Sequence, residues 1–484
     1  MSSYGFNFDN SYLKLPNELY TITAPISVNS PKIVIVNREL LDSLGVDLAP
    51  LSDIQKAELF SGNQNPPGTR PFCQAYAGHQ YAHFTLLGDG RAHIIGEHIT
   101  PDGTRVDCQL KGSGPTPYSR GGDGRAALGP MLREYIISEA MHSLGIPTTR
   151  SLAVVESGEL VIRERALPGA ILTRVASSHI RVGTFEYAAT QENHDLLRDL
   201  LKYAVGRHFP GLKSTPHMAL DFLNNVAERQ ANLITQWMRV GFIHGVMNTD
   251  NMSISGETID YGPCAFMNEY DPRTVFSYID KRGRYAFGNQ PIIAQWNIAR
   301  LAESLLPLIH DNKESAVSIA TEAINRFPSI YENKYLTMMR SKLGLVTKEK
   351  EDVTLINDLL DWMNKHSADY TNTFMYLTYG ERCTEELYTQ ESFLNWHQRW
   401  KERFIRESRQ SQSPRLLMTK NNPVVIPRNH QVEKALASAT EGNIKQLHLL
   451  LQALKSPYEN SKSIKKYQSP PKPCERIKNT FCGT

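Results

Sequence analysis

The chain has 484 residues, of which 40% are hydrophobic, and it carries 53 lysines and arginines against 50 aspartates and glutamates. Its length predicts one large two-lobed domain or two domains, and its composition excludes a wholly disordered chain. The net charge of +3 is too small to indicate a nucleic acid or a membrane surface as a partner. We also find no apolar run long enough for a membrane span, and we expect no signal peptide.

Strand-like segments dominate the first part of the chain. The first 65 residues predict an irregular N-terminal arm that contains one apolar run at 32–36. After it come three alternating runs, separated by glycine-containing turns at 88–90 and 101–103, and these runs lie at residues 82–87, 92–99 and 105–110. The pattern predicts an antiparallel meander whose third strand ends at Lys111.

A glycine-rich connection at 112–124 leads into a predicted helix at 126–144, where apolar residues recur at helical spacing. Further strands are predicted on both sides of a turn at Ser157-Gly158, and they lie at 151–155, 160–164 and 170–175. Beyond residue 190 the pattern becomes helical, with helices predicted at 218–240, 292–309, 314–326, 351–366 and 430–455.

This order predicts an α+β protein with a strand-rich lobe followed by a helix-rich lobe. A protein-kinase-like two-lobed fold fits it, although other α+β enzymes share the same pattern. The expected units are an N-terminal arm (1–65), an N-lobe with nucleotide-binding motifs (66–190), a helical C-lobe (191–455) with a catalytic and metal loop at 242–263, and a loosely packed tail rich in Ser, Lys and Pro (456–484).

Gly88-Asp89-Gly90-Arg91 is the first motif that suits a phosphate. Gly88 and Gly90 would let backbone N–H groups approach phosphate oxygens, and Arg91 adds a planar fork of donors. Taken alone, the motif is more typical of an ordinary hairpin turn.

Lys111 and Glu134 form the second pattern, because a strand lysine aimed by a helix glutamate holds nucleotide phosphates in kinases. A solvated strand end and a polar helix face would explain the two residues separately. Their order after the glycine loop favours the functional interpretation.

Segment 242–262 carries the strongest signal. It predicts a short hairpin turning at Gly256-Glu257, in which Ser253 faces Asp260 and Asn251 lies close by. An amide oxygen and a carboxylate at Asn251 and Asp260 suit Mg²⁺, and Asp250 is then available to accept a proton from a hydroxyl. Two loop acids making local turns are the alternative.

Two further features remain ambiguous from the residues alone. Arg174 and Arg181 predict either a phosphate clamp or surface charge, and Asp123-Gly124-Arg125 predicts either a ligand contact or a helix-entry turn. His244 is expected to be a hydrogen-bonded structural residue with no catalytic role.

The six cysteines are scattered, with no spacing typical of zinc sites, so we expect neither a disulfide framework nor structural zinc. A reducing cytoplasmic location fits this usage best.

The motifs closely resemble the selenoprotein O family of protein adenylyltransferases, which are built on a kinase-like scaffold. The resemblance runs from FDNSYL near the start, through GRYAFGNQP, to the last three residues, CGT. Its main blocks are GDGR (88–91), QLKGSG (109–114), TPYSR (116–120), GDGRA (122–126), REY (133–135), GIPTTR (145–150), SHIR (178–181), NTDN (248–251) and DYGP (260–263).

The resemblance implies that ATP binds reversed relative to a kinase, so that AMP is transferred to Ser, Thr or Tyr hydroxyls of protein substrates. Some members are reported to transfer UMP as well. By position, Lys111, aimed by Glu134, matches the phosphate-binding lysine, Asn251 and Asp260 match the ligands of Mg²⁺ or Mn²⁺, and Asp250 matches the proton acceptor. The other positions that match nucleotide contacts are Gly88, Gly90, Arg91, Asp123, Gly124, Arg174 and Arg181.

The C-terminus departs from the family pattern. Animal members carry selenocysteine third from the end, where this chain has Cys482. In some bacterial relatives that cysteine pairs with one downstream of DYGP, but Phe276 and Ser277 occupy that neighbourhood here. Redox switching through this bond is therefore not expected unless Cys264 or Cys474 substitutes.

Two rival functions use the same residues. An ordinary kinase would need the same lysine, aspartates and asparagine with ATP in the usual orientation. A catalytically silent nucleotide-binding pseudokinase is disfavoured because Lys111, Glu134, Asn251 and Asp260 are all present.

Overall fold

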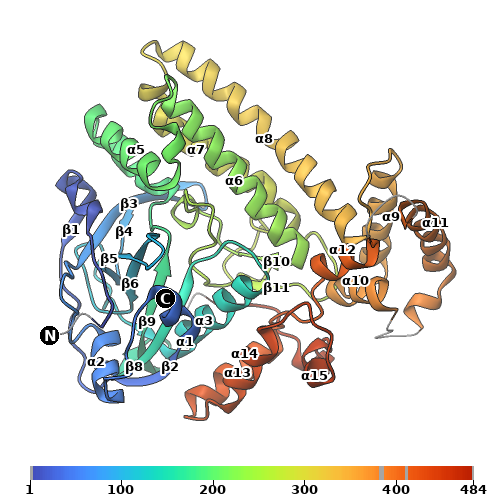
Figure 1. The fold of residues 1–484 in the computed structure, drawn as a ribbon, viewed down its shortest axis with the longest axis horizontal. Helices are drawn as coiled ribbons and strands as arrows, with labels where there is room; N and C mark the ends of the chain where they lie inside the picture. Colours follow the sequence, from blue (N-terminus) through green and yellow to red (C-terminus); the bar gives the residue numbers. More distant parts are fainter. Residues whose placement is uncertain (1–3, 381–385, 409–412, 482–484) are drawn as a thin grey trace.

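The computed structural model describes residues 4–380, 386–408 and 413–481, and it contains a lobe built on an antiparallel sheet and a lobe built from helices (Figure 1). The strands are β1 Tyr20–Ile22, β2 Lys32–Val36, β3 Phe72–Gln80, β4 His83–Gly88, β5 Ala92–Ile99, β6 Arg105–Lys111, β7 Ala126–Ala127, β8 Arg150–Ile162, β9 Ala166–Ala176, β10 Phe242–Ile243 and β11 Ala265–Phe266.

The helices of the first half are α1 Arg38–Leu44, α2 Asp53–Ser61, α3 Leu128–Ser143, α4 Val182–Thr190, α5 His194–His208 and α6 Met218–Val240. Those of the second half are α7 Gln290–Ile309, α8 Lys313–Lys342, α9 Asp352–Lys365, α10 Tyr370–Tyr379, α11 Glu391–Ser408, α12 Pro414–Asn421, α13 Asn429–Thr440, α14 Lys445–Leu454 and α15 Lys465–Gln468. Within the described residues, no helix is both long enough and apolar enough to span a bilayer.

The large sheet separates two hydrophobic cores. Its strand order is β1-β3-β5-β6-β9-β8-β2, with β4 paired to β3 and β7 to β9. Because successive strand residues face opposite sides, Ile94 and Leu172 join the core that contains α3, whereas Ile95 and Ile171 join the core that contains α1 and α2. The prediction of an irregular N-terminal arm is therefore wrong in part, since β1, β2, α1 and α2 are regular elements of this lobe.

The predicted meander is wrong at its first step. β4 pairs with β3, a strand that the sequence pattern did not reveal, and not with β5. The backbone N–H of Asp89 donates to the Gln74 carbonyl at 3.0 Å, and the Asp89 carboxylate accepts from the Gln74 N–H at 2.9 Å. Gly88-Asp89-Gly90 is thus fixed against β3 and does not close a hairpin. The pairing of β5 with β6, which brings in Lys111, is confirmed.

The predicted turn at Ser157-Gly158 is also wrong. β8 continues through it, and the register against β9 shifts between Glu156 and Leu160. Gly158 has a φ of +74°, so the extra residues are absorbed by an irregularity within one long strand.

In the helical lobe, α3 and α6 lie close to their predicted bounds. The predicted end of a helix at residue 326 is wrong, because α8 continues past Pro328 while burying Ala320, Ala323 and Phe327. A proline in a helix interior removes one backbone hydrogen bond, and the packing of α8 against α6 and α7 offsets that loss. The predicted helix at 430–455 is two helices, α13 and α14, separated at Gly442, which has a φ of +86°.

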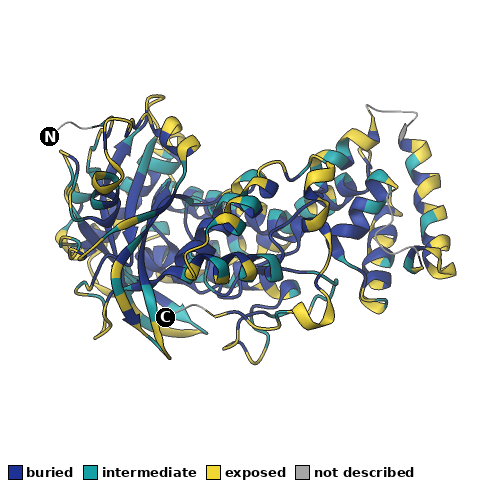
Figure 2. Cartoon of the chain, turned by 90° about the horizontal axis from the view of Figure 1, so that it is seen from below, coloured by how far each residue is buried: buried dark blue, intermediate teal, exposed yellow. Residues whose placement is uncertain are grey.

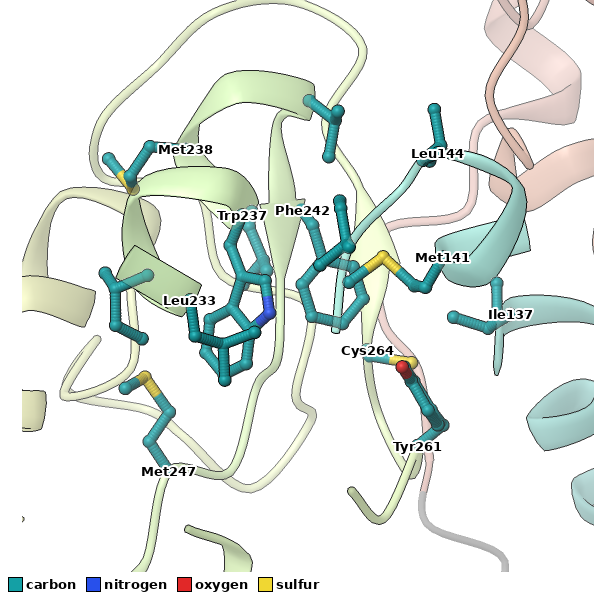
Figure 3. Packing of buried hydrophobic residues seen from close by; sticks show 14 of the residues in the cluster. Ile137, Met141, Leu144, Leu233, Trp237, Met238, Phe242, Met247, Tyr261 and Cys264 are labelled. Atoms are coloured by element: carbon teal, nitrogen blue, oxygen red, sulfur yellow. The ribbon is translucent and has the colours of Figure 1, made fainter. Parts of the chain in front are cut away.

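The buried residues concentrate in the sheet and in the helices next to it, whereas the outlying helices expose one face (Figure 2). One part of this core supports segment 242–262. Trp237 of α6 packs on Phe242 with ring centroids 5.4 Å apart, and Phe242 packs on Tyr261 at 6.1 Å (Figure 3). This packing of Tyr261 attaches the preceding residue, Asp260, to the hydrophobic core.

The hairpin predicted at Gly256-Glu257 is wrong. Ser253 bridges to Arg181 and Thr258 bridges to Thr148, so Ser253 does not face Asp260. The Glu257 carboxylate instead accepts hydrogen bonds from the N–H and the hydroxyl of Ser177 at 3.0 and 2.7 Å. These hydrogen bonds to Ser177, which follows β9, hold residues 254–260 against the strand-rich lobe.

Residues 456–481 follow the surface of the helical lobe and are mostly exposed. Their last part is nevertheless anchored, because the Thr480 hydroxyl donates to the Pro263 carbonyl at 2.6 Å and Thr480 bridges to Ser277. Cys264 is buried and Cys474 exposed. Cys482 lies outside the described residues, and the expectation that it does not take part in redox switching stays a prediction.

Candidate active site

A cavity of about 800 Å³ gathers side chains from both lobes. All eleven candidate site residues line it, namely Gly88, Gly90, Arg91, Lys111, Asp123, Gly124, Arg174, Arg181, Asp250, Asn251 and Asp260. Seven basic and five acidic side chains line the cavity, an excess of two positive charges that favours a polyanionic ligand.

Lys111 and Glu134 meet as their order in the sequence predicted. The Lys111 ammonium, at the end of β6, donates to Glu134 Oε2 on α3 at 2.8 Å. Glu134 Oε1 accepts from Arg174 Nε at 2.8 Å, so one buried carboxylate aims two cations. Burial alone would raise the pKa of Glu134, but Arg174 and Lys111 outweigh it and hold that pKa below its usual value.

Asp260 is the centre of the charge network. Its Oδ1 accepts from Lys111 at 3.0 Å and from Arg174 at 2.7 Å, and its Oδ2 accepts from Arg181 at 3.1 Å. Burial would raise the pKa of this carboxyl, but the three cations dominate and hold the pKa well below its usual range. Asp260 therefore stays ionised.

Arg174 and Arg181 do not contribute surface charge, so that alternative is wrong. Each residue is only 2% exposed. Arg174 also donates to Gln109 Oε1 at 3.3 Å, and the Arg181 guanidinium lies 4.4 Å from the centroid of the Tyr76 ring. Both guanidiniums line the cavity.

Asp250 lies beneath the β3–β4 hairpin in a short 3₁₀ turn, Thr249–Asn251. A Cβ added to Gly78 of β3 would lie 2.3 Å from Asp250 Oδ1, so only glycine permits this approach. That Oδ1 is buried without a hydrogen-bond partner among the described residues. Burial raises the pKa of Asp250 to about 6, with Arg181 opposing the rise.

The glycine segments shape one wall of the cavity. A Cβ on Gly88 would collide with the Tyr118 ring at 2.3 Å, and one on Gly90 would lie 2.8 Å from the Tyr118 carbonyl oxygen. Asp123 is paired with Arg163 at 2.8 Å, which fixes the turn that contains Gly124. This turn reaches the cavity, so the ligand-contact alternative for residues 123–125 stays open.

His244 has the structural role that was predicted for it. The ring is fully buried, and its Nε2 donates to the Ile259 carbonyl at 2.8 Å. This bond fixes the backbone immediately before Asp260.

The cavity residues to which the sequence analysis gave no role of their own include Asp89, Gln109 and Tyr76. Gln109 Nε2 donates to the buried Asp89 at 3.4 Å while its Oε1 accepts from Arg174. The signal for Gln109 was its position two residues before Lys111, because alternate residues of a strand share one face. Tyr76 gave no signal, since β3 itself was not recognised.

The oxygen donors at Asn251 and Asp260 fit a divalent cation. The Asn251 amide nitrogen donates to the Val246 carbonyl at 3.0 Å, which leaves its oxygen for a ligand. Among the described residues, no group of three His, Cys, Asp or Glu side chains could hold a metal alone. One carboxylate, one amide oxygen and nucleotide phosphates are a donor set typical of Mg²⁺.

The chain is similar in sequence to proteins of one known family. The family model described as "Protein adenylyltransferase SelO" matches residues 3–455. The chain belongs to the SelO family. Its relatives include proteins named "Protein nucleotidyltransferase YdiU" from Nitrosococcus oceani (56% identical), Syntrophotalea carbinolica (55%) and Geobacillus kaustophilus (55%). In each comparison 99% of this chain is covered, together with 98%, 98% and 99% of the respective SelO-family relative.

Proposed function

We propose that this protein transfers AMP from ATP to Ser, Thr or Tyr hydroxyls of proteins, on a kinase-like scaffold with the nucleotide reversed. Membership of the SelO family and the relatives named protein nucleotidyltransferase support the class of reaction. The observation that carries the proposal is the convergence of Lys111, Arg174 and Arg181 on Asp260, with Asp250 buried in the same cavity.

The positions of the buried positive charges support the reversed orientation. The terminal phosphate of ATP carries the most negative charge, and fully buried guanidiniums stabilise it best because water does not screen them. Arg174 and Arg181 are both buried, so the β- and γ-phosphates would occupy the deep part of the cavity. The α-phosphate would then face Asp250.

The chain's own residues would bind and orient the nucleotide and deprotonate the acceptor hydroxyl. Lys111, aimed by Glu134, would neutralise phosphate oxygens, and the backbone around Gly88 and Gly90 would approach them closely. Asp250 would accept the proton of the incoming hydroxyl at Oδ1. Its raised pKa makes it a better base than an exposed aspartate, although it is still ionised at neutral pH. The new bond joins the hydroxyl oxygen to the α-phosphorus, and pyrophosphate leaves.

Asn251 and Asp260 would hold Mg²⁺ or Mn²⁺. When bound, the cation would neutralise the charge that builds up on the phosphates during transfer. The complex of a divalent cation with a triphosphate has a net negative charge. It would therefore also balance the positive charge of the three side chains that contact Asp260.

Ordinary phosphoryl transfer is the second candidate, because the same residues would serve ATP in the other orientation. Incubation with hydroxyl-bearing proteins and ATP labelled at either the α- or the γ-phosphate separates the two reactions. We expect protein-bound label only from the α-position, and UTP labelled at the α-position tests UMP transfer in parallel. Label retained only from the γ-position would establish a kinase, and nucleotide binding without transfer in either metal would establish a pseudokinase.

A further inference from the structure

Segment 267–289 connects β11 to α7 and lies at the mouth of the cavity. Ile279 is 59% exposed and lines the cavity. The Tyr285 hydroxyl donates to Asn248 Oδ1 at 2.5 Å, two residues before Asp250. The segment is therefore fixed beside the place where an acceptor hydroxyl would enter.

The acidic side chains of this segment already have partners. Glu269 pairs with Arg476, and Asp271 pairs with Arg273. Asp280 is buried and accepts from the backbone N–H groups of residues 284 and 285 at 2.9 and 2.8 Å. None of these carboxylates pairs with the basic residues of positions 281–284.

Those basic residues carry unbalanced charge. Lys281 and Arg282 are exposed, Arg284 is half-buried, and none of them forms an ion pair with a described residue. Arg284 Nε is buried without a hydrogen-bond partner in the described chain, and its guanidinium lies 4.9 Å from the centroid of the Trp296 ring. We call Lys281, Arg282, Arg284 and Trp296 the basic rim.

One member of the basic rim, Trp296, is also linked to the loop that contains Asp250 through two successive contacts. The Trp296 ring on α7 lies 5.3 Å from the His79 ring on β3. The backbone N–H of His79 donates to the Thr249 hydroxyl at 2.7 Å, one residue before Asp250. A chain that presents a hydroxyl to Asp250 would therefore pass the rim.

We propose that the basic rim binds an acidic segment of the protein substrate close to the acceptor hydroxyl, an inference that rests on the proposed function. The charges are complementary, and two exposed cations next to an arginine stacked on tryptophan form a surface of the kind that dominates binding interfaces. None of the four rim residues lines the cavity, so they stay available when a triphosphate is bound. The substrate class is then a hydroxyl with Asp or Glu nearby in the chain.

A pair of fluorescent peptides tests this directly. Each carries one serine, flanked by four glutamates in one peptide and by four glutamines in the other, and both are titrated with the full chain, Mg²⁺ and a non-hydrolysable ATP analogue. We expect the acidic peptide to bind at least about fivefold more tightly, as two modest ion pairs would give. Added NaCl should reduce this preference.

The double variant Lys281→Glu/Arg282→Glu should abolish the preference, because it reverses the two exposed positive charges. Both positions are exposed, so the substitutions do not disturb the core. The matched control is Lys465→Glu/Lys466→Glu, two adjacent exposed lysines of α15 that line no part of the cavity. This control should keep the preference. Equal binding of both peptides, a preference that survives in the rim variant, or tighter binding of a single-stranded oligonucleotide would overturn the proposal.

Transfer of label from α-labelled ATP to the same peptides separates this inference from the proposed function. Transfer that is indifferent to flanking charge would contradict the rim alone. Preferential binding of the acidic peptide without any transfer would contradict the proposed function and leave the rim as a docking surface.

Discussion

At the scale of single residues, Asp260 combines charge with backbone strain. Its φ of +61° lies in the left-handed region, which costs a non-glycine residue on the order of 1 kcal/mol. The bonds from Lys111, Arg174 and Arg181 hold the carboxylate in place. Strain that persists under such strong fixation is typical of functional sites.

Replacement of Asp260 by alanine should abolish nucleotide transfer, because it removes the proposed metal ligand and the group that positions three cations. The variant should also lose stability, by about 3–5 kcal/mol, because those cations lose their common counter-charge. Labelled transfer and chemical unfolding measure the two effects. Asp271→Ala is the control, since within the described residues this half-buried carboxylate pairs only with exposed Arg273. A wild-type rate in Asp260→Ala would refute the site assignment.

The sequence revealed the charged members of the cavity better than the residues that position them. Lys111, Glu134 and Asp260 stand in recognisable motifs, and the structure brings them into contact. Gly78 gave no such signal, because its role depends on the approach of Asp250 from 172 positions further along the chain. Contacts of that kind depend on how the lobes pack and cannot be read from local spacing.

At the scale of elements, the β3–β4 hairpin has an unusual tip. Tyr81 and Ala82 both have positive φ, at +50° and +70°, although neither is glycine. The Tyr81 N–H donates to Asn248 Oδ1 at 3.1 Å, so the tip is attached to the loop that contains Asp250. Primed turns of this kind normally favour Asn-Gly.

Ala82→Gly should therefore increase the free energy of unfolding by up to about 1 kcal/mol, because glycine removes the left-handed penalty and the added chain entropy offsets only part of the gain. The control is Ala437→Gly on the exposed face of α13, which should lose about 1 kcal/mol. Chemical denaturation of both variants makes the comparison. Equal losses in both would show that the tip is not strained.

Elements with regular periodicity were predictable, and elements fixed by distant partners were not. α3, α6 and β6 follow from their own apolar spacing. β3 has few strand-forming residues in its sequence, FCQAYAGHQ. It forms a strand because it pairs with β1 and β4. The connection at 254–260 follows its bonds to Ser177 and Pro147, which no local turn pattern encodes.

At the scale of the whole molecule, buried cations join the lobes. Arg133, next to Glu134 on α3, donates to the Cys264 carbonyl at 2.6 Å and pairs with Glu433 of α13 at 2.6 Å. Arg239 at the end of α6 donates to the Leu144 carbonyl at 2.8 Å. The helix that aims Lys111 is thus held against both the DYGP loop and the C-terminal helices.

Lys342 extends this connection into the helical lobe and has no charged partner among the described residues. It is 1% exposed, its ammonium nitrogen donates to the Arg239 carbonyl at 2.8 Å, and it lies 3.9 Å from the centroid of the Phe374 ring. Burial, with a smaller contribution from Arg239, lowers the pKa of Lys342 well below its usual value. The folded protein therefore binds this proton less readily than the unfolded chain does.

This difference predicts how stability depends on pH. Between the lowered pKa of the folded state and the ordinary value of about 10.4, the unfolded chain holds the extra proton, so stability rises with pH. Lys342→Met removes this dependence. The melting temperature of the variant minus that of the wild type should therefore fall from pH 7 to pH 9.5, because the wild type gains stability over this range. The cost of the lost hydrogen bond does not vary with pH, so it leaves this trend unchanged. The exposed control Lys350→Met should show no such trend, and a constant difference for Lys342→Met would mean that the buried lysine stays charged.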